Sequence, residues 1–329
     1  MSSILSSWLH ITDSCNLSCP YCYVVKRGSQ MSEDTGLAAV DAVVHSAQQH
    51  GYKGIKLKYA GGEPTLKFPL IQQLHEYARR LTDKARLELQ EVVLSNGVML
   101  TSAMLAYLAQ EDMRLMISLD GLDVAQGKLR CLADGRSSLP FVVQGVELAL
   151  AAGLKPYLST TVTRVNINSL PEVVAFALDH ELPLSLNLYR ENPCSAENTG
   201  LVAGPEELIA GLLRALKVIE ERLPPYRLID GLLDLVPFSG PQEHPCAAGR
   251  DYLVIDTQGQ IARCQMVMDE VVSDIHADDP LQDVRDFMDG FQNVSVDEIV
   301  ECRDCPWKYY CAGGCPLLAG RRAGQVGGD

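Results

Sequence analysis

Three cysteines lie within eight residues near the start of the chain, at Cys15, Cys19 and Cys22. The spacing of three and then two intervening residues lets one short loop bring three thiolates to the corners of a cubane iron–sulfur cluster. The fourth iron then has no protein ligand, and an open iron can bind and activate a small molecule. The spacing therefore predicts a reactive cluster rather than one that only passes electrons.

A zinc knuckle, or three thiols buried in the core, is the alternative interpretation of this loop. A closed zinc site needs a fourth ligand, which His10 could supply, and such sites are usually built from two close cysteine pairs. A zinc site would leave unexplained the polar motifs that follow the predicted strands.

The composition limits the partners of the chain. Lysine and arginine total 28 against 42 acidic residues, and the net charge of −14 argues against nucleic acid because phosphate binding needs a basic surface. The first residues lack the pattern of a signal peptide, and no apolar run reaches the roughly 18 residues that indicate a membrane span. Eleven cysteines in tight groups favour metal binding over disulfides, so we expect a cytoplasmic protein with no membrane partner.

Short apolar runs alternate with amphipathic stretches through the first two thirds of the chain. Strands are predicted at residues 8–12, 55–59, 88–94, 115–119, 157–162 and 184–189. Helices are predicted at residues 34–49, 66–82, 102–110, 139–152, 170–178 and 205–222. This alternation predicts an α/β fold, a partial (β/α)6 TIM-type barrel over residues 1–222. A linker at 223–245 and a small cysteine-rich α+β domain at 246–329, opening with a hairpin at 252–256 and 260–265, would follow.

Polar motifs follow several predicted strands, at the end of the barrel where chemistry gathers. The second strand runs into Gly61, Gly62, Glu63 and Pro64, where glycines allow close backbone approach to a ligand and Glu63 can balance a positive charge; an ordinary tight turn is the alternative. The other strand ends carry Ser95, Ser118, Asp120, Arg164, Tyr189, Glu191 and Cys194. The last three are candidates for substrate contact or proton transfer, and a solvated loop acid is the alternative for Glu191. Cys131 fits no motif, and we expect it in the core.

The first cysteine loop, with Tyr21 just before its last cysteine, resembles the signature of the radical S-adenosylmethionine enzymes. Residues 61–64 resemble the second motif of that family, and the resemblance covers residues 5 to 222. It implies a 4Fe–4S cluster whose open iron binds S-adenosylmethionine. Reduction by one electron would cleave this cofactor to a 5′-deoxyadenosyl radical that abstracts hydrogen from a substrate.

The same resemblance implies roles for single residues. Residues 61–64 would hold the amino group of S-adenosylmethionine, and Tyr21 would lie near its adenine. Ser95, Ser118 and Asp120 would contact the ribose. Arg164 would pair with the carboxylate, which the planar fork of a guanidinium matches.

Six further cysteines resemble the SPASM extension of this family, which carries auxiliary 4Fe–4S clusters: Cys246, Cys264, Cys302, Cys305, Cys311 and Cys315. By that resemblance Cys246, Cys264 and Cys315 would bind a first auxiliary cluster, and Cys302, Cys305 and Cys311 a second. The family's final cysteine is missing, so either the chain is truncated near Asp329 or the second cluster has an unusual ligand set. The first cluster would have an open iron or take a ligand such as Cys194 or His244. A zinc ribbon formed by the last four cysteines is the alternative.

Enzymes with this extension mostly act on peptides or proteins, so the resemblance implies a peptide-maturase type of enzyme. The expected reaction is a cross-link or related C–H modification of a ribosomally made peptide. The alternatives are an anaerobic sulfatase-maturating, formylglycine-forming enzyme and, in another class, an iron–sulfur electron carrier. Because Cys15 lies so near the start, leader recognition would need a separate leader-binding protein, another surface of this chain, or no leader at all. We expect electrons from a flavodoxin, a ferredoxin or a reductase.

Overall fold

The computed structural model describes residues 3–228, 231–236 and 240–320. Within these ranges one sheet contains the strands β1 (Ile4–Thr12), β2 (Gly54–Gly61), β3 (Glu88–Ser95), β4 (Arg114–Ser118), β5 (Tyr157–Val162), β6 (Leu184–Leu188), β7 (Tyr252–Ile255), β8 (Gln260–Ala262) and β9 (Val271–Asp274). Their order is β6-β5-β4-β3-β2-β1-β7-β8-β9. The strands from β6 to β7 are parallel, and β8 and β9 are antiparallel. Since β6 and β9 are both edges, the sheet is an open, partial barrel, as predicted.

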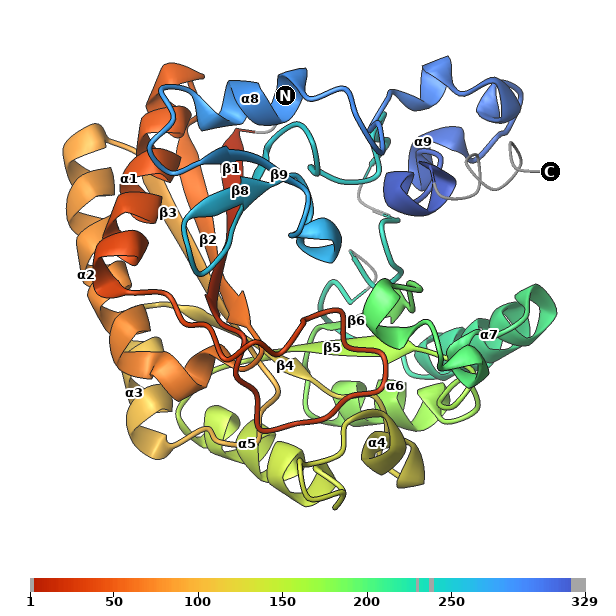
Figure 1. Ribbon diagram of the computed structural model, residues 1–329. Helices are drawn as coiled ribbons and strands as arrows, with labels where there is room; N and C mark the ends of the chain where they lie inside the picture. Colours follow the sequence, from red (N-terminus) through yellow and green to blue (C-terminus); the bar gives the residue numbers. More distant parts are fainter. Residues whose placement is uncertain (1–2, 229–230, 237–239, 321–329) are drawn as a thin grey trace.

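Helices cover the outer face of this sheet in an arc (Figure 1). They are α1 (Glu33–Gln49), α2 (Phe68–Ala85), α3 (Ser102–Gln110), α4 (Val124–Leu129), α5 (Leu139–Ala151), α6 (Leu170–Asp179) and α7 (Pro205–Glu221). Two shorter helices, α8 (Pro280–Asp286) and α9 (Lys308–Cys311), belong to the C-terminal part. The core lies between the helices and the sheet, where Leu5, Leu9, Ile55 and Leu57 are fully buried. No helix in the described ranges is long and apolar enough to cross a membrane.

Local sequence signals explain where the helices begin. The side chain of Ser32 accepts a hydrogen bond from the Thr35 amide and caps α1, and Thr101 caps α3 in the same way. Prolines in the first turn start α5, α6 and α7. The helix predicted from residue 66 begins at Phe68 instead, because residues Pro64–Lys67 form a 3-10 turn, η1, that Glu63 caps.

The C-terminal part joins the barrel sheet directly. The predicted hairpin is present as β7 and β8, and β7 pairs in parallel with β1, with Ser6 opposite Tyr252. The sequence did not predict this pairing, or β9, α4 and α8. Because β1 has a neighbour on both sides, it begins at Ile4 rather than at the predicted residue 8.

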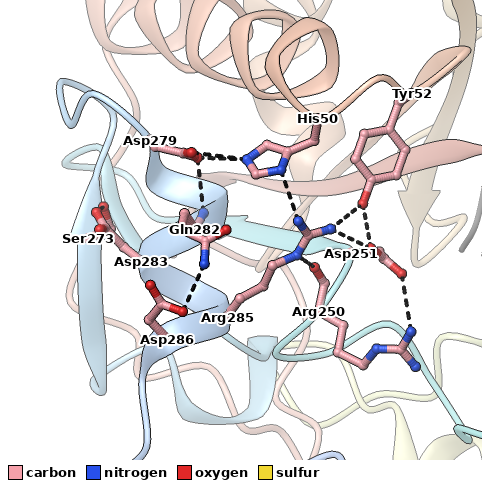
Figure 2. A network of polar contacts seen from close by, with 10 residues as sticks. All are labelled: His50, Tyr52, Arg250, Asp251, Ser273, Asp279, Gln282, Asp283, Arg285 and Asp286. Carbon is pink, nitrogen blue, oxygen red and sulfur yellow. Dashed lines mark hydrogen bonds and ion pairs between the residues drawn. The ribbon is translucent and has the colours of Figure 1, made fainter.

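A polar network fixes the C-terminal part against the barrel (Figure 2). Arg285 of α8 donates to the Asp251 carboxylate at 2.9 Å, to the Tyr52 hydroxyl at 2.8 Å and to Nδ1 of His50 at 2.9 Å. Nε2 of His50 lies 2.9 Å from the Asp279 carboxylate at the start of α8. His50 and Tyr52 lie between α1 and β2, so these contacts join elements far apart in the sequence.

Candidate active site and cysteine groups

A cavity of about 710 Å³ lies on the inner face of the sheet, and alternate side chains of β1 to β6 line its wall. The loop after β1 carries Cys15, Cys19 and Cys22, and all three line this cavity. Gly61, Ser95 and Ser118 line it at the ends of their strands. The strand ends and the first cysteine group, which we define as Cys15, Cys19 and Cys22, therefore meet in one place, as expected for a barrel.

The barrel holds the cysteine loop through buried polar contacts. The side-chain amide of Asn96, which is 6% exposed, donates to Oδ1 of Asn16 at 2.7 Å and approaches Sγ of Cys15 at 3.8 Å. The amide of Ser18 donates to the carbonyl of Cys131 at 2.8 Å, and Nζ of Lys26 donates to the carbonyl of Leu17. Neighbouring segments therefore determine the path of this loop.

Cys131 is half-buried and its Sγ donates to the Ser18 carbonyl at 3.1 Å. The prediction that it lies in the core was therefore wrong. It belongs to the segment that pairs with the first cysteine loop, where Leu17 and Leu132 form an antiparallel bridge.

The two glycines after β2 permit a close approach between backbone segments. Gly61 has φ of +148°, and a Cβ there would overlap the Thr12 carbonyl oxygen. A Cβ on Gly62 would overlap the Ser14 carbonyl oxygen and lie 2.6 Å from that of Asp13. The amide of Glu63 donates to the Ser14 carbonyl at 2.8 Å. In this structure the glycine pair seats the base of the cysteine loop on the barrel.

The carboxylate of Glu63 is buried and accepts hydrogen bonds from neighbouring residues. It accepts from Oγ of Ser95 at 2.9 Å and from the Asn96 amide at 2.7 Å, and it also accepts from the amide and hydroxyl of Thr65. Burial raises its pKa, and these hydrogen bonds oppose the rise. Neither Glu63 nor the buried Pro64 lines the cavity, so the charge-balancing role expected for Glu63 stays a prediction.

Asp120 is the centre of a second buried network. One carboxylate oxygen accepts from the Tyr21 hydroxyl and from Nε of Arg130 at 2.9 Å, and the other accepts from the Thr161 amide at 2.8 Å. The Arg130 guanidinium also lies over the Tyr21 ring, 5.5 Å from its centroid. Burial raises the pKa of the Tyr21 phenol well above its usual range, so this residue is a neutral hydrogen-bond donor. Asp120 itself is fully buried and positions Tyr21 and Arg130, which do line the cavity.

The structure places the other predicted residues in different settings. Tyr189 lines the cavity and its hydroxyl lies 2.6 Å from Oγ of Ser195. Arg164 does not reach the cavity, because it lies beyond β5 and pairs with Glu207 of α7 at 3.1 Å while half-exposed. Cys194 is exposed near the Tyr23 carbonyl, and Glu191 is exposed and does not line this cavity.

Among the cavity residues that reasoning from the sequence missed, Asn96 and Arg130 lie beside the first cysteine group. Asn96 stands inside a strand-end motif with Ser95, and that position was a usable signal. Arg130 follows α4 rather than a strand, and nothing in its local sequence marks it. Arg130 lies beside the cysteine loop, near Tyr21, whereas Arg164 does not line the cavity.

A second cysteine group, defined as Cys246, Cys264 and Cys315, is assembled in the C-terminal part. All three thiols pack against one small apolar cluster that contains Tyr252 and Phe291. Burial raises the pKa of Cys264 to about 11, and the neighbouring Cys246 and Cys315 add to the rise. Tyr252 also lines the cavity, so this group lies beside it.

The third cysteine group, defined as Cys302, Cys305 and Cys311, lies near the surface. Cys305 and Cys311 are exposed, and burial followed by the proximity of the other two thiols raises the pKa of Cys302. Turns connect the group, with the Cys305 amide donating to the Cys302 carbonyl at 3.1 Å. The structure groups these cysteines in the sets that the family resemblance implies, and their roles as ligands stay predictions.

The donor chemistry of these groups suits iron–sulfur clusters, whose irons are held by cysteine thiolates. In the described residues no three side chains of His, Cys, Asp or Glu converge closely enough to hold one ion. His10 lines a separate cavity and its Nε2 pairs with Asp13 at 2.9 Å, so it does not serve as a fourth ligand to the first group. Burial raises the pKa of Cys19 to about 12, and a bound metal offsets such a cost by stabilising the thiolate.

Sequence relatives include two kinds of protein. The chain is 27% identical over 171 residues to Uncharacterized protein MJ0907 of Methanocaldococcus jannaschii, a match of 52% of this chain and 57% of the relative. It is 26% identical over 311 residues to a Probable GTP 3′,8-cyclase of Sulfurisphaera tokodaii, covering 88% and 87%. It is also 29% identical over 194 residues to a GTP 3′,8-cyclase of Paenarthrobacter nicotinovorans, covering 58% and 52%. The chain thus spans little more than half the length of two of these three relatives.

Solved structures share the fold over almost the whole chain. Native anSMEcpe with bound AdoMet and Cp18Cys peptide has a TM-score of 0.79 at 19% identity, covering 96% of this chain and 90% of that one. Streptococcus suis SuiB bound to precursor peptide SuiA has a TM-score of 0.66 at 16% identity, covering 95% and 72%. The family model of the Radical SAM superfamily matches residues 9–177, more than half of the chain, including the first cysteine group and residues 61–64. The chain therefore belongs to the radical SAM superfamily, whose members bind a 4Fe–4S cluster and S-adenosylmethionine.

Proposed function

We propose that this radical SAM enzyme modifies a peptide or protein, installing a cross-link or a related change at a C–H bond of a ribosomally made peptide. The observation that carries the proposal is the position of the second cysteine group beside the cavity that the first group lines. A substrate in this cavity would lie between two clusters. That placement suits a reaction in which one cluster begins radical chemistry and another takes up an electron.

In this proposal the C-terminal part is a SPASM-type domain at residues 246–329, after a linker at 223–245. The second group holds one auxiliary cluster and the third group another. The family's final cysteine, a ligand of the second auxiliary cluster, would be expected among the last nine residues, which lie outside the described residues. Cys194 and His244 were the two further candidate ligands of the first auxiliary cluster. The Cys194 thiol lies near the Tyr23 carbonyl, and Nδ1 of His244 lies 3.1 Å from the Asn293 carbonyl, so both contact groups other than the three cysteines.

The residues around the cavity would divide the work of binding. The first group would hold the 4Fe–4S cluster, which together with S-adenosylmethionine supplies the radical that abstracts hydrogen. Residues 61–62, Ser95, Ser118 and Tyr21 line the adjoining wall and would contact S-adenosylmethionine, with Asp120 positioning Tyr21. Tyr189 would face the substrate. A flavodoxin, a ferredoxin or a reductase would supply electrons, and a separate protein would bind a leader peptide.

Cyclisation of GTP is the second candidate function. It is favoured by the relative from Sulfurisphaera tokodaii, named a Probable GTP 3′,8-cyclase, which aligns with most of this chain. Cationic side chains in the cavity would also suit a triphosphate. The peptide proposal is preferred because it uses all six C-terminal cysteines, and because anSMEcpe and SuiB have both been solved with bound peptides.

The test is anaerobic reconstitution with iron, sulfide and a chemical reductant, followed by incubation with S-adenosylmethionine and each class of substrate. Mass spectrometry would follow candidate precursor peptides, a cysteine peptide for formylglycine formation, and GTP. We expect 5′-deoxyadenosine release in every case and a peptide with a changed mass. Conversion of GTP with no change in any peptide would replace the proposal with the cyclase. A reduced cluster that never cleaves S-adenosylmethionine would indicate an electron carrier.

A further inference from the structure

Six cationic side chains line the cavity, and no acidic residue is among the described residues that line it. The whole chain nevertheless carries a net charge of −14. The cavity is therefore a basic interior within an acidic protein. A basic cleft with walls of low dielectric concentrates the electric field and attracts anions.

Three of these cations are already paired by the protein. Arg130 donates to Asp120 at 2.9 Å, Arg190 to Asp234 at 2.7 Å, and Nζ of Lys26 to the Leu17 carbonyl. These three lie around the cysteine loop and the end of β6. Each of these three cations therefore has at least one hydrogen-bond partner within the protein.

The other three, Lys56, Lys58 and Arg114, have no hydrogen bond or ion pair to any described residue. Lys58 is half-buried and its Nζ lies over the Tyr252 ring, 4.8 Å from the centroid. Burial lowers the pKa of Lys58 to about 8, with Lys56 adding to the effect, and burial also lowers the pKa of Lys56. Lys56 and Lys58 are partly removed from water, and the only groups near Lys58 that oppose the lowering of its pKa are the thiols of Cys246 and Cys264. Burying a cation with so little counter-charge is costly, so these two lysines, with the exposed Arg114 beside them, are suited to a ligand that brings negative charge.

The strand register brings these donors together. Trp8 pairs with Lys58, Lys58 with Val92, and Val92 with Arg114, so these four residues form one row across β1 to β4. All four line the cavity, and Lys56 lies one inward position before Lys58. The buried indole nitrogen of Trp8 also lacks a hydrogen-bond partner. Since neighbouring strands are about 4.8 Å apart, the row is wide enough for a group of several oxygens.

We propose that this row, formed by Trp8, Lys56, Lys58 and Arg114, is an oxyanion subsite that binds a carboxylate or phosphate group of the substrate. It lies at the middle of β1 and β2 and at the start of β4, whereas the first cysteine group follows the C-terminal end of β1. An anion held there leaves the rest of the substrate to extend toward the cysteines. This subsite would add a substrate-binding role to the proposed function. It depends on that function only because both use the same cavity. A carboxylate would come from an acidic peptide side chain, and a phosphate from a nucleotide.

The experiment is calorimetric titration of the anaerobically reconstituted enzyme already loaded with S-adenosylmethionine. Because S-adenosylmethionine is already bound, an anionic probe that binds in the titration is not occupying the site of that cofactor's own carboxylate. The probes are penta-glutamate, inorganic tripolyphosphate and neutral penta-glutamine. We expect at least one anionic probe to bind about tenfold or more tightly than penta-glutamine, with an affinity that weakens as salt is added. Preference for penta-glutamate assigns a peptide carboxylate, and preference for tripolyphosphate assigns a phosphate.

Two substitutions test the assignment of residues. We expect Lys58→Gln and Arg114→Gln each to weaken binding of the anionic probe about tenfold or more. The exposed Arg114 makes its variant the safer one for folding. The control is Lys155→Gln, which removes one charge from an exposed residue paired with Glu181 and should leave affinity unchanged. Equal binding of all three probes, or full affinity in both cavity variants, would overturn the subsite whatever a peptide-modification assay finds.

Discussion

The first and third cysteine groups contain the same number of thiols but are built in different ways. Cys15, Cys19 and Cys22 line a cavity, and the barrel holds their loop through Asn96, the glycine pair and the segment around Cys131. Cys302, Cys305 and Cys311 lie near the surface on short turns, and two of the three are exposed. The contrast lies in what determines the shape of each loop.

This difference predicts how each group depends on its cluster. Contacts with the barrel define the first loop, so we expect it to keep its path in the apoprotein. A cluster in the third group would act as a cross-link between turns that have few other contacts, and its binding free energy would count as folding free energy. The first group is therefore a prepared site, and the third is a site that the cluster completes.

The largest effect should come from the cysteines themselves. Replacement of Cys15, Cys19 and Cys22 by alanine removes all three expected ligands of the first cluster. We expect 5′-deoxyadenosine release to fall to the level of an enzyme-free control in a chromatographic assay. The matched variant Cys302→Ala/Cys305→Ala should retain cofactor cleavage while losing modified product. Normal product from that variant would remove the auxiliary role of the third group.

Gly62→Ala should have the next largest effect, because the added Cβ would overlap the Ser14 carbonyl at the base of the first loop. Overpacking of this kind costs about 1–3 kcal/mol. We expect a lower thermal midpoint together with less iron bound to the first group. The control is Gly200→Ala, where a Cβ meets nothing within 4 Å. If both variants behaved alike, the glycine pair would not seat the loop.

Two asparagines allow an intermediate test. Asn96 approaches Sγ of Cys15 at 3.8 Å, and Asn293 approaches Sγ of Cys246 at 3.9 Å. Substituting a residue that orients a metal ligand typically costs about 10–100-fold in affinity or activity. We expect Asn96→Ala to reduce the rate of S-adenosylmethionine cleavage within that range. Asn293→Ala should reduce product formation and spare cleavage.

The opposite pattern in these two variants, with cleavage lost in Asn293→Ala and kept in Asn96→Ala, would contradict the assignment of the first group to S-adenosylmethionine. An equal loss of cleavage in both would mean that the two groups do not act separately. Iron content measured on both proteins separates loss of a cluster from loss of rate.

Periodicity predicted the strand–helix alternation and spacing predicted the first cysteine group, because those signals are local, whereas the other two groups were implied only by the family resemblance. Arg164 lies outside this pattern. Tyr157, Ser159 and Thr161 line the cavity at alternate positions of β5, but that strand ends at Val162, and Arg164 lies beyond it and pairs with Glu207. Alternation along the strand therefore does not determine where Arg164 points, and its role toward the cofactor carboxylate stays a prediction.

Other features depend on contacts that no local pattern records. The pairing of β7 with β1 joins residues about 250 positions apart, and Arg130 reaches the cavity only because Asp120 holds it. Lys56 and Lys58 alternate with apolar residues, a pattern that equally describes a strand with one face in solvent. In an open barrel that polar face lines the cavity instead.

The smallest effect should come from Asp297, which accepts from Nζ of Lys308 at 2.8 Å and from the Tyr309 hydroxyl at 2.9 Å, next to the third group. The hydrogen bonds from Lys308 and Tyr309 lower the pKa of Asp297 below its ordinary value of 3.8. Because the pKa of Asp297 is lower in the folded protein, the ionised carboxylate stabilises the folded state at pH values above the ordinary pKa of 3.8. This contribution is lost as the pH falls through the lowered pKa of the folded protein. Asp297→Asn imitates the protonated form at neutral pH.

We expect Asp297→Asn to speed amide hydrogen exchange across residues 302–311 of the reconstituted enzyme, leaving exchange around the first group unchanged. The matched substitution is Asp134→Asn, which removes an exposed carboxylate paired with Arg136 at 2.7 Å in the turn beside the first loop. Because buried contacts from Asn96 and the glycine pair hold that loop, its exchange should not respond. A first loop that loosened as much as the third group would mean that surface ion pairs support both, and the contrast between a prepared and a cluster-completed site would be lost.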